Sequence, residues 1–247
     1  METGCRFFEL VDLSYYSQFI QDELFIFEQQ LSYINEGWGK IDEHERNNVI
    51  IEMLKCDVVN LLAIHGHPYD RKHIEEVVRN RYYNNHLYSE VVDDLTIDAL
   101  NLVFDVSLRY NKELTYESIL NWFRLFNYGE NIISLTDNEL EAIMSFVNWF
   151  NATAMTGDKY IGNALLRGAA VYIYVSSNMP KSKNNHLLAM MLARKALSQT
   201  IDDVIVFNFY LLMSKKEELN TYTEEGLSLD IIKEHIIDFA DVVLDEM

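Results

Sequence analysis

Turn-forming residues are scarce in this sequence, and that scarcity constrains the fold more than any other feature. The 247 residues include 9 glycines and 2 prolines, whereas average usage predicts about 30 of the two types together. Glycine and proline build the tight turns of all-β folds and the phosphate loops of dinucleotide-binding folds. We therefore expect helices joined by short connections, and β-sandwiches, propellers and collagen-like arrays are nearly excluded.

Apolar residues recur at three- and four-residue steps along most of the chain, as they do on one face of a helix. Thr136 and Glu139 form a capping-box pattern, which marks a helix start, and Gly37 is placed to end the first long helix. We predict an all-α fold of about ten helices with little or no sheet. The expected helices span approximately residues 14–36, 42–64, 70–82, 95–111, 116–126, 136–150, 158–176, 183–197, 201–214 and 229–246.

The chain is strongly acidic. It has 39 acidic and 20 basic residues, a net charge of −19 and a pI near 4.6. Binding to nucleic acid is driven mostly by basic side chains that displace counterions, so we expect no direct contact with DNA or RNA. Residues 224–247 hold eight acids and one lysine. We interpret them as an amphipathic surface helix, with an acidic docking face as the alternative.

Cysteine usage and the apolar runs indicate a cytoplasmic protein. Cys5 and Cys56 form neither a disulfide framework nor a metal-spaced set. The chain start lacks a basic segment followed by an apolar one, as a secretion signal would have. The longest apolar run, residues 204–213, is too short to span a bilayer. We therefore expect no membrane partner.

Three short segments hold residue types that occur in functional sites. Residues 65–73 combine three histidines with Asp70, which are common metal ligands, but we interpret them as a solvated turn. Asp93 and Asp94 precede a helix, where acids complement the helix dipole. The aromatic run at 122–128 has helical spacing, so core packing is favoured over base stacking.

Several segments resemble Fic-domain proteins, and they follow the same order along the chain. Residues 164–178, the break that follows and the leucine-rich stretch 187–194 resemble the two helices that flank the family's active loop. Residues 114–122 and 141–151 resemble two earlier family helices. Residues 58–71 resemble the N-terminal inhibitory helix of one Fic subgroup. The resemblance covers about residues 50–215.

The resemblance implies a mostly helical fold and, in active members, transfer of AMP from ATP to a hydroxyl group of a target protein. In that family a loop histidine takes the hydroxyl proton, a role that needs a pKa near the working pH. A loop acid holds Mg²⁺, a glycine-rich backbone cradles the phosphates at a helix N-terminus, and an arginine pairs with them.

This chain departs from the family's loop at almost every position. Asn178 stands where the histidine is expected, and Ser182 replaces the acid. Lys183 and Asn185 replace the two glycines, and His186 replaces the arginine, while Asn184 is retained. In the inhibitory motif, which here comprises Leu61, His65 and Gly66, His65 replaces the glutamate. The segment 123–135 is also shorter than the family's flap region.

We therefore predict a catalytically inactive Fic-like protein that binds another protein, with no catalytic residue, no metal and no cofactor. ATP and Mg²⁺ are expected only if residual activity exists. The chain divides into an N-terminal helical region (1–112), a degenerate Fic-like core (113–215) and an acidic C-terminal helix (216–247), expected to form one compact unit.

Two alternative functions stay open. The first is an enzyme with altered chemistry, in which Lys181 and Lys183 hold an anion at a helix N-terminus and His186 acts as a displaced base. The second is an acidic decoy for a nucleic-acid-binding protein. The expected partner is another protein, for which the acidity of the chain suggests a basic surface, and a homo-oligomer is a further alternative.

Overall fold

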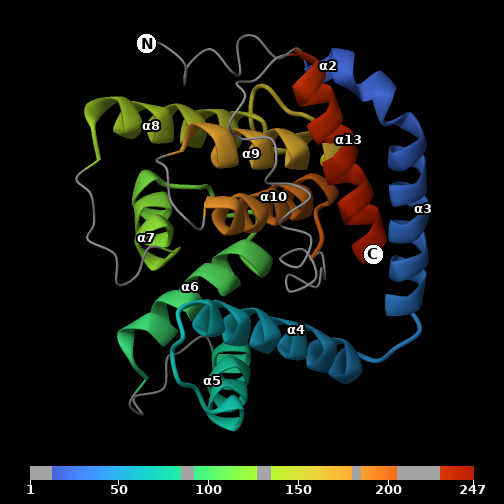
Figure 1. Cartoon of the computed structure of the whole chain (residues 1–247). Coiled ribbons are helices and arrows are strands. Elements are labelled where there is room, and N and C mark those ends of the chain that lie inside the picture. The colour runs from blue at the N-terminus through green and yellow to red at the C-terminus, as the bar shows by residue number, and fades with distance from the viewer. Residues whose placement is uncertain (1–12, 85–91, 127–134, 180–184, 205–228) are drawn as a thin grey trace.

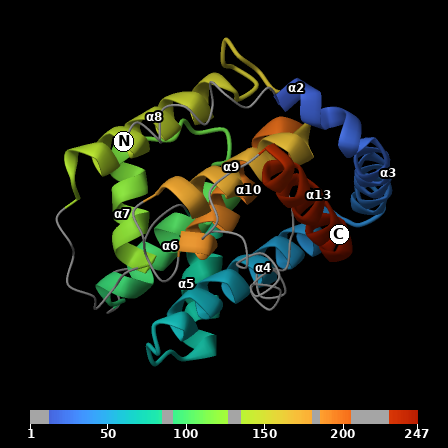
Figure 2. The ribbon, with the colours of Figure 1, turned by 45° about the horizontal axis from the view of Figure 1, so that its top comes forward.

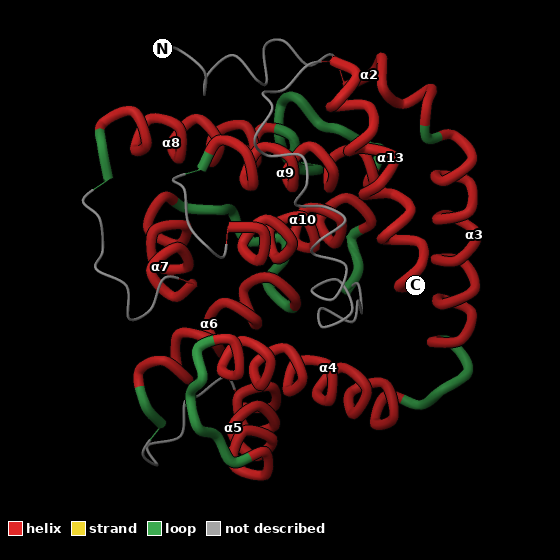
Figure 3. The backbone as a smooth tube through the Cα atoms, in the orientation of Figure 1, coloured by secondary structure: helices red, strands yellow, loops and turns green. Residues whose placement is uncertain are grey.

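The structure is a computed structural model that describes residues 13–84, 92–126, 135–179, 185–204 and 229–247. These residues form ten α-helices and one short 3-10 helix, and no strand is found among them (Figure 3). The predicted all-α fold is confirmed for this part of the chain. The elements are α2 (Leu13–Tyr16), η1 (Ser17–Phe19), α3 (Gln21–Trp38), α4 (Glu43–Ile64), α5 (Arg71–Asn84), α6 (Asp94–Ser107), α7 (Tyr116–Phe126), α8 (Asp137–Ala152), α9 (Ala164–Asn178), α10 (Asn185–Ile201) and α13 (Leu229–Glu246).

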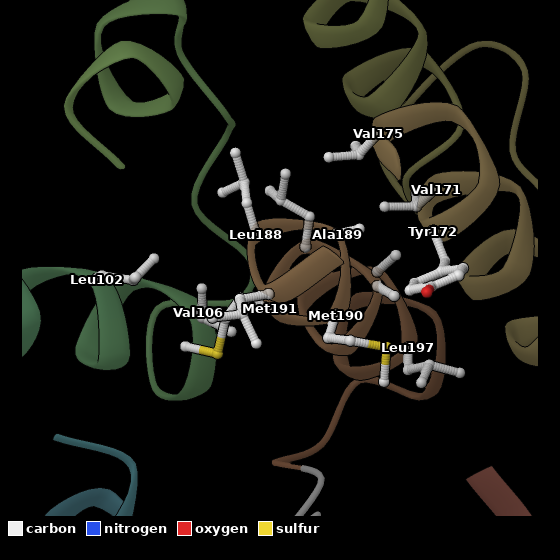
Figure 4. Packing of buried hydrophobic residues seen from close by; sticks show 14 of the residues in the cluster. Leu102, Val106, Val171, Tyr172, Val175, Leu188, Ala189, Met190, Met191 and Leu197 are labelled. Carbon is white, nitrogen blue, oxygen red and sulfur yellow. The ribbon is translucent and has the colours of Figure 1, made fainter. Parts of the chain in front are cut away.

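Helix α10 forms the centre of the molecule. Its side chains are buried from Asn185 through Thr200, and α9 makes the most extensive contact with it (Figure 1). In Figure 4, Val171 of α9, Val106 of α6 and Met191 of α10 lie in one apolar cluster. A helix that is apolar all round is stable only when other helices cover it on every side.

The remaining helices are arranged around α9 and α10. Helices α6 and α7 contact α10, α8 contacts α9, and α4 packs on α5 and α6 (Figure 1). Helix α13 packs on α9 and on α3, and α3 forms an outer edge of the molecule in both views (Figures 1 and 2). None of the described helices is both long and apolar enough to cross a membrane.

The capping box at α8 is confirmed. The Glu139 amide donates to Thr136 Oγ1 over 3.3 Å, and the Thr136 amide donates to Glu139 Oε2 over 2.7 Å. These bonds satisfy amides that would otherwise lack a partner in the first turn. Helix α8 therefore begins where the sequence predicts.

Several helix boundaries differ from the prediction: α6 ends at Ser107 rather than near residue 111, and α10 ends at Ile201 rather than near residue 197. Gly37 lies inside α3, which ends at Trp38 with Gly39 as its C-cap. Helix α9 begins at Ala164, because Asn163 caps it by accepting from the Leu166 amide over 2.9 Å. Glycine and asparagine end or begin a helix through local backbone geometry. The sequence pattern alone therefore locates a helix boundary only to within a few residues.

The helix predicted over residues 201–214 is not observed where it can be checked. Helix α10 continues to Ile201, and Asp202 then adopts a positive φ of 54°. A left-handed residue interrupts a helix, so residues 202–204 do not continue it. Residues 205–214 lie outside the described part of the chain.

Candidate functional site

The break predicted between two core helices is present. Helix α9 ends at Asn178, and Met179 follows in an extended conformation with φ −72° and ψ 160°. The residue before a proline is driven toward this conformation, so Pro180 accounts for the end of the helix. Lys181, Ser182, Lys183 and Asn184 of the candidate loop lie outside the described residues.

The two described loop candidates begin α10. Asn185 and His186 are 7% and 8% exposed, which is unusual for polar side chains in the first turn of a helix. A general base must come within hydrogen-bond reach of the proton it removes. The imidazole of His186 offers little surface to a substrate hydroxyl in this arrangement.

The segment that resembles the inhibitory motif forms the end of α4. Leu61 is a core residue, and His65 is the C-cap. The Gly66 amide donates to Ala63 O, and the His67 amide donates to Leu62 O, both over 3.0 Å. Gly66 has a φ of 62°. This is a Schellman motif. The need for a positive φ where the helix ends is enough to explain why position 66 is a glycine.

The inhibitory-like helix α4 does contact the helix that follows the candidate loop. Arg194 Nη1 of α10 donates to Asp57 Oδ2 over 2.5 Å, and its Nη2 lies 3.1 Å from Met53 Sδ. Both partners belong to α4. This contact lies near the middle of both helices, eight residues from His65 and eight from His186.

The histidine-rich segment lies between α4 and α5. His67 Nε2 is 3.3 Å from Asp93 Oδ1, and the Asp93 carboxylate also accepts from the amide and hydroxyl of Thr96 over 3.0 and 2.8 Å. Asp93 therefore caps α6, as the dipole interpretation predicts. No group of three or more His, Cys, Asp or Glu side chains gathers among the described residues.

The aromatic run belongs to the core where the structure describes it. Trp122 and Phe126 are buried in α7, and Phe123 is partly buried against the same cluster. The predicted core role is confirmed for these three residues. Tyr128 lies outside the described part of the chain.

Among the described residues, Arg167 is the cation with the least exposed side chain, and no sequence motif indicated a role for it. Its side chain is fully buried in α9 and its guanidinium lies 4.8 Å from the Phe150 ring centroid. Burial lowers its pKa to about 10. Its donors reach Thr153 Oγ1 (3.2 Å), Phe150 O (2.9 Å), Ala196 O (2.9 Å), Gln199 Oε1 (2.8 Å) and Thr200 Oγ1 (3.3 Å).

These acceptors lie at the C-terminal ends of α8 and α10, where carbonyl groups carry partial negative charge. No carboxylate contacts Arg167 in the part of the chain that the structure describes. The cation is held by neutral acceptors and by two helix dipoles. It ties three core helices together.

Lys195 makes a similar contact on the other side of α10. Its Nζ donates to the carbonyl oxygens of Asp105, Arg109 and Tyr110 over 3.1, 2.9 and 2.9 Å. The three acceptors lie at and beyond the C-terminal end of α6. Burial lowers the pKa of Lys195 to about 8. The ammonium group thus satisfies carbonyls that a helix end leaves without partners.

These buried cations change the surface charge. Four basic side chains, those of Arg81, Arg167, Arg194 and Lys195, are buried, but Asp57 is the one buried acid in the described residues. Among the described residues, the exposed charge is therefore more negative than the count of their charged residues alone indicates. A sequence signal for Arg194 and Lys195 does exist, since they interrupt the apolar run from Leu187 to Leu197.

Comparison with known protein families finds no family model that matches the chain, and comparison with curated proteins finds no relative.

Proposed function

We propose that this chain is a catalytically inactive Fic-like protein that acts by binding another protein in the cytoplasm. The sequence support is the replacement of the family's base, metal ligand and glycines by Asn178, Ser182 and Lys183. Loss of a general base alone removes roughly 10²–10⁴ in rate. Loss of the groups that stabilise charge in the transition state removes more.

The burial of the α10 start is the observation that carries this proposal. The family's loop needs bare backbone amides at this helix N-terminus to approach phosphates closely. Here Asn185 occupies the position of the second glycine and His186 that of the arginine, and both side chains are buried. The first turn of α10 is thus filled by side chains that pack into the protein.

The acidic surface supports a partner with a basic surface. Four buried cations remove positive charge from the exterior, and complementary charge increases the rate and the selectivity of protein association. Such binding weakens as salt concentration rises. A decoy for a nucleic-acid-binding protein is the second candidate that this observation favours.

The proposed absence of catalysis is tested with the full chain, radiolabelled ATP and a cell lysate, alongside His186→Ala. His44→Ala is the matched control, because His44 is exposed at the start of α4. We expect no transfer of label by any of the three proteins and no heat of binding with Mg²⁺-ATP. Label transfer that His186→Ala abolishes and His44→Ala retains would overturn the proposal in favour of an enzyme with altered chemistry.

A further inference from the structure

Helix α3 exposes apolar side chains on the side that faces away from the core. Phe25, Ile26 and Tyr33 are 60%, 44% and 79% exposed. Their spacing places them along one side of the helix, and the buried Phe27 lies on another. A surface helix in a monomer is normally apolar only toward the core. Helix α3 therefore has an apolar surface beyond the one used in folding.

The surface beside this stripe is hollowed. An open depression of about 630 Å³ is lined by Gln29, Tyr33 and Glu36 of α3 and by Met247 at the chain end, among others. Tyr33 thus belongs both to the stripe and to the wall of the depression. The depression is shallow, and the exposed aromatic ring of Tyr33 on its wall can contact a partner's apolar side chains.

Acidic residues frame the stripe. Asp22 and Glu36 lie near the two ends of α3, three residues before Phe25 and three after Tyr33, and both are exposed. Glu28 is a third exposed acid on the helix. Helix α13, which packs on α3, carries further exposed acids, Asp230, Glu234, Asp241 and Asp245, but these are not part of the stripe.

The nearby lysines already have partners in the fold. Lys40 Nζ lies 2.7 Å from Glu36 Oε1, and Lys233 Nζ lies 4.2 Å from the Phe19 ring centroid. The Lys40 charge offsets that of Glu36, so the negative charge beside the stripe comes from Asp22 and Glu28. The surface therefore combines exposed aromatic residues with net negative charge.

We propose that the α3 outer face, defined by Asp22, Phe25, Ile26, Glu28 and Tyr33, docks a basic amphipathic helix of a partner protein. The partner's apolar side would cover the aromatic residues, and its lysines or arginines would pair with the acids. This inference rests on the proposed protein-binding function and gives it a surface and a partner chemistry.

A second copy of the chain fits this surface less well. Pairing of two α3 outer faces would bring Asp22 and Glu28 of one copy toward the same acidic surface of the other. Like charges placed together across an interface oppose association. A basic helix meets the same residues with the opposite charge.

The test measures the binding of a fluorescent designed helix made of leucine and lysine to the full chain by fluorescence polarisation. A helix of the same pattern with glutamate in place of lysine is the peptide control. The double variant Phe25→Ser/Tyr33→Ser is expected to raise the Kd of the lysine peptide roughly tenfold or more. The matched variant Tyr83→Ser/Met144→Ser alters exposed apolar residues of α5 and α8 and is expected to leave the Kd unchanged.

The charge contribution is tested with Asp22→Lys/Glu28→Lys, which is expected to weaken binding and to reduce its salt dependence. Native-like binding by both α3 variants would overturn the docking proposal, as would an equal loss in the Tyr83→Ser/Met144→Ser control. A dimer seen by light scattering that Tyr33→Ser dissociates would overturn it in favour of self-association.

The experiments distinguish a failure of the docking proposal from a failure of the proposed inactive, protein-binding function. Absence of peptide binding at α3 together with absence of AMP transfer would remove the docking surface alone. Transfer of AMP would remove the proposed inactive function, whatever the peptide result.

Discussion

Arg194 of α10 and Asp57 of α4 form a buried ion pair, although 137 positions separate them in the sequence. Only 2% and 3% of the two side chains are exposed. Burial raises the pKa of the Asp57 carboxyl, and the charge of Arg194 opposes that rise. The pair connects the helix that resembles the inhibitory segment to the helix at the centre of the core.

Removal of the Asp57 carboxylate is expected to destabilise the fold strongly. Asp57→Ala leaves the Arg194 guanidinium buried beside no carboxylate, and such a loss costs about 3–5 kcal/mol. The free energy of unfolding is measured with urea. Glu36→Ala is the control, because Glu36 pairs with Lys40 and both side chains are exposed, and such a surface pair contributes about 0–1 kcal/mol. Equal losses in the two variants would contradict a special role for the buried pair.

Replacement of Arg167 is expected to lower the free energy of unfolding by a comparable amount, but for a different reason. Arg167→Met removes the donors for acceptors in α8 and α10, and each buried acceptor left alone costs about 1–3 kcal/mol. We expect thermal and urea unfolding at much lower midpoints than in the parent chain. Arg124→Met, which changes an exposed arginine of α7, should shift them little. An unfolding midpoint of Arg167→Met equal to that of the parent chain would show that these hydrogen bonds do not contribute to stability.

Lys195 is expected to make stability rise with pH in the alkaline range. Its pKa is about 8 in the folded chain and 10.5 without the fold. Between these values the unfolded chain binds more protons than the folded chain, so the free energy of unfolding increases with pH. Urea unfolding at several pH values should give a steeper rise for the parent than for Lys195→Met. Lys72→Met, at an exposed site on α5, should keep the parent's slope.

Two glycines are expected to respond to alanine with opposite signs. A Cβ at Gly157 would lie 2.1 Å from the Ala152 carbonyl oxygen, whereas nothing lies within 4 Å of a Cβ at Gly37. Gly37 lies inside α3, so Gly37→Ala should stabilise the chain by about 0.5–1 kcal/mol. Gly157→Ala should destabilise it, because the clash is with backbone. Thermal unfolding of both variants measures the signs, and stabilisation by Gly157→Ala would contradict the loop geometry.

Much of the helical pattern could be read from the sequence because it depends on neighbouring residues. The capping box of Thr136 and Glu139 and the cap at Asp93 each act within one turn of helix. The end of α9 before Pro180 follows from the conformational restriction on the preceding residue. The start of α9 was misplaced, since Asn163 rather than an earlier polar residue caps it.

The sequence correctly predicted a break between the two helices that the structure shows as α9 and α10. It did not predict that Asn185 and His186, the described residues of the candidate loop, are buried. His186 was expected to be a displaced base only under the alternative of an enzyme with altered chemistry, and its burial arises from packing at the start of α10. Periodicity could not reveal this, because α10 is buried on every side and its polar residues, such as Arg194 and Lys195, are buried with the apolar ones. The Fic-like relationship and the inactive function stay predictions.

The sequence by itself determined an all-helical chain, most helix starts and a strong negative charge, because local propensity, capping and composition do not depend on distant residues. Only the tertiary structure decided which charges are buried and which apolar residues stay outside. Arg194 meets Asp57, and Arg167 meets the ends of α8 and α10, through contacts between distant parts of the chain. Tyr33 on α3 stays exposed although α13 packs against that helix.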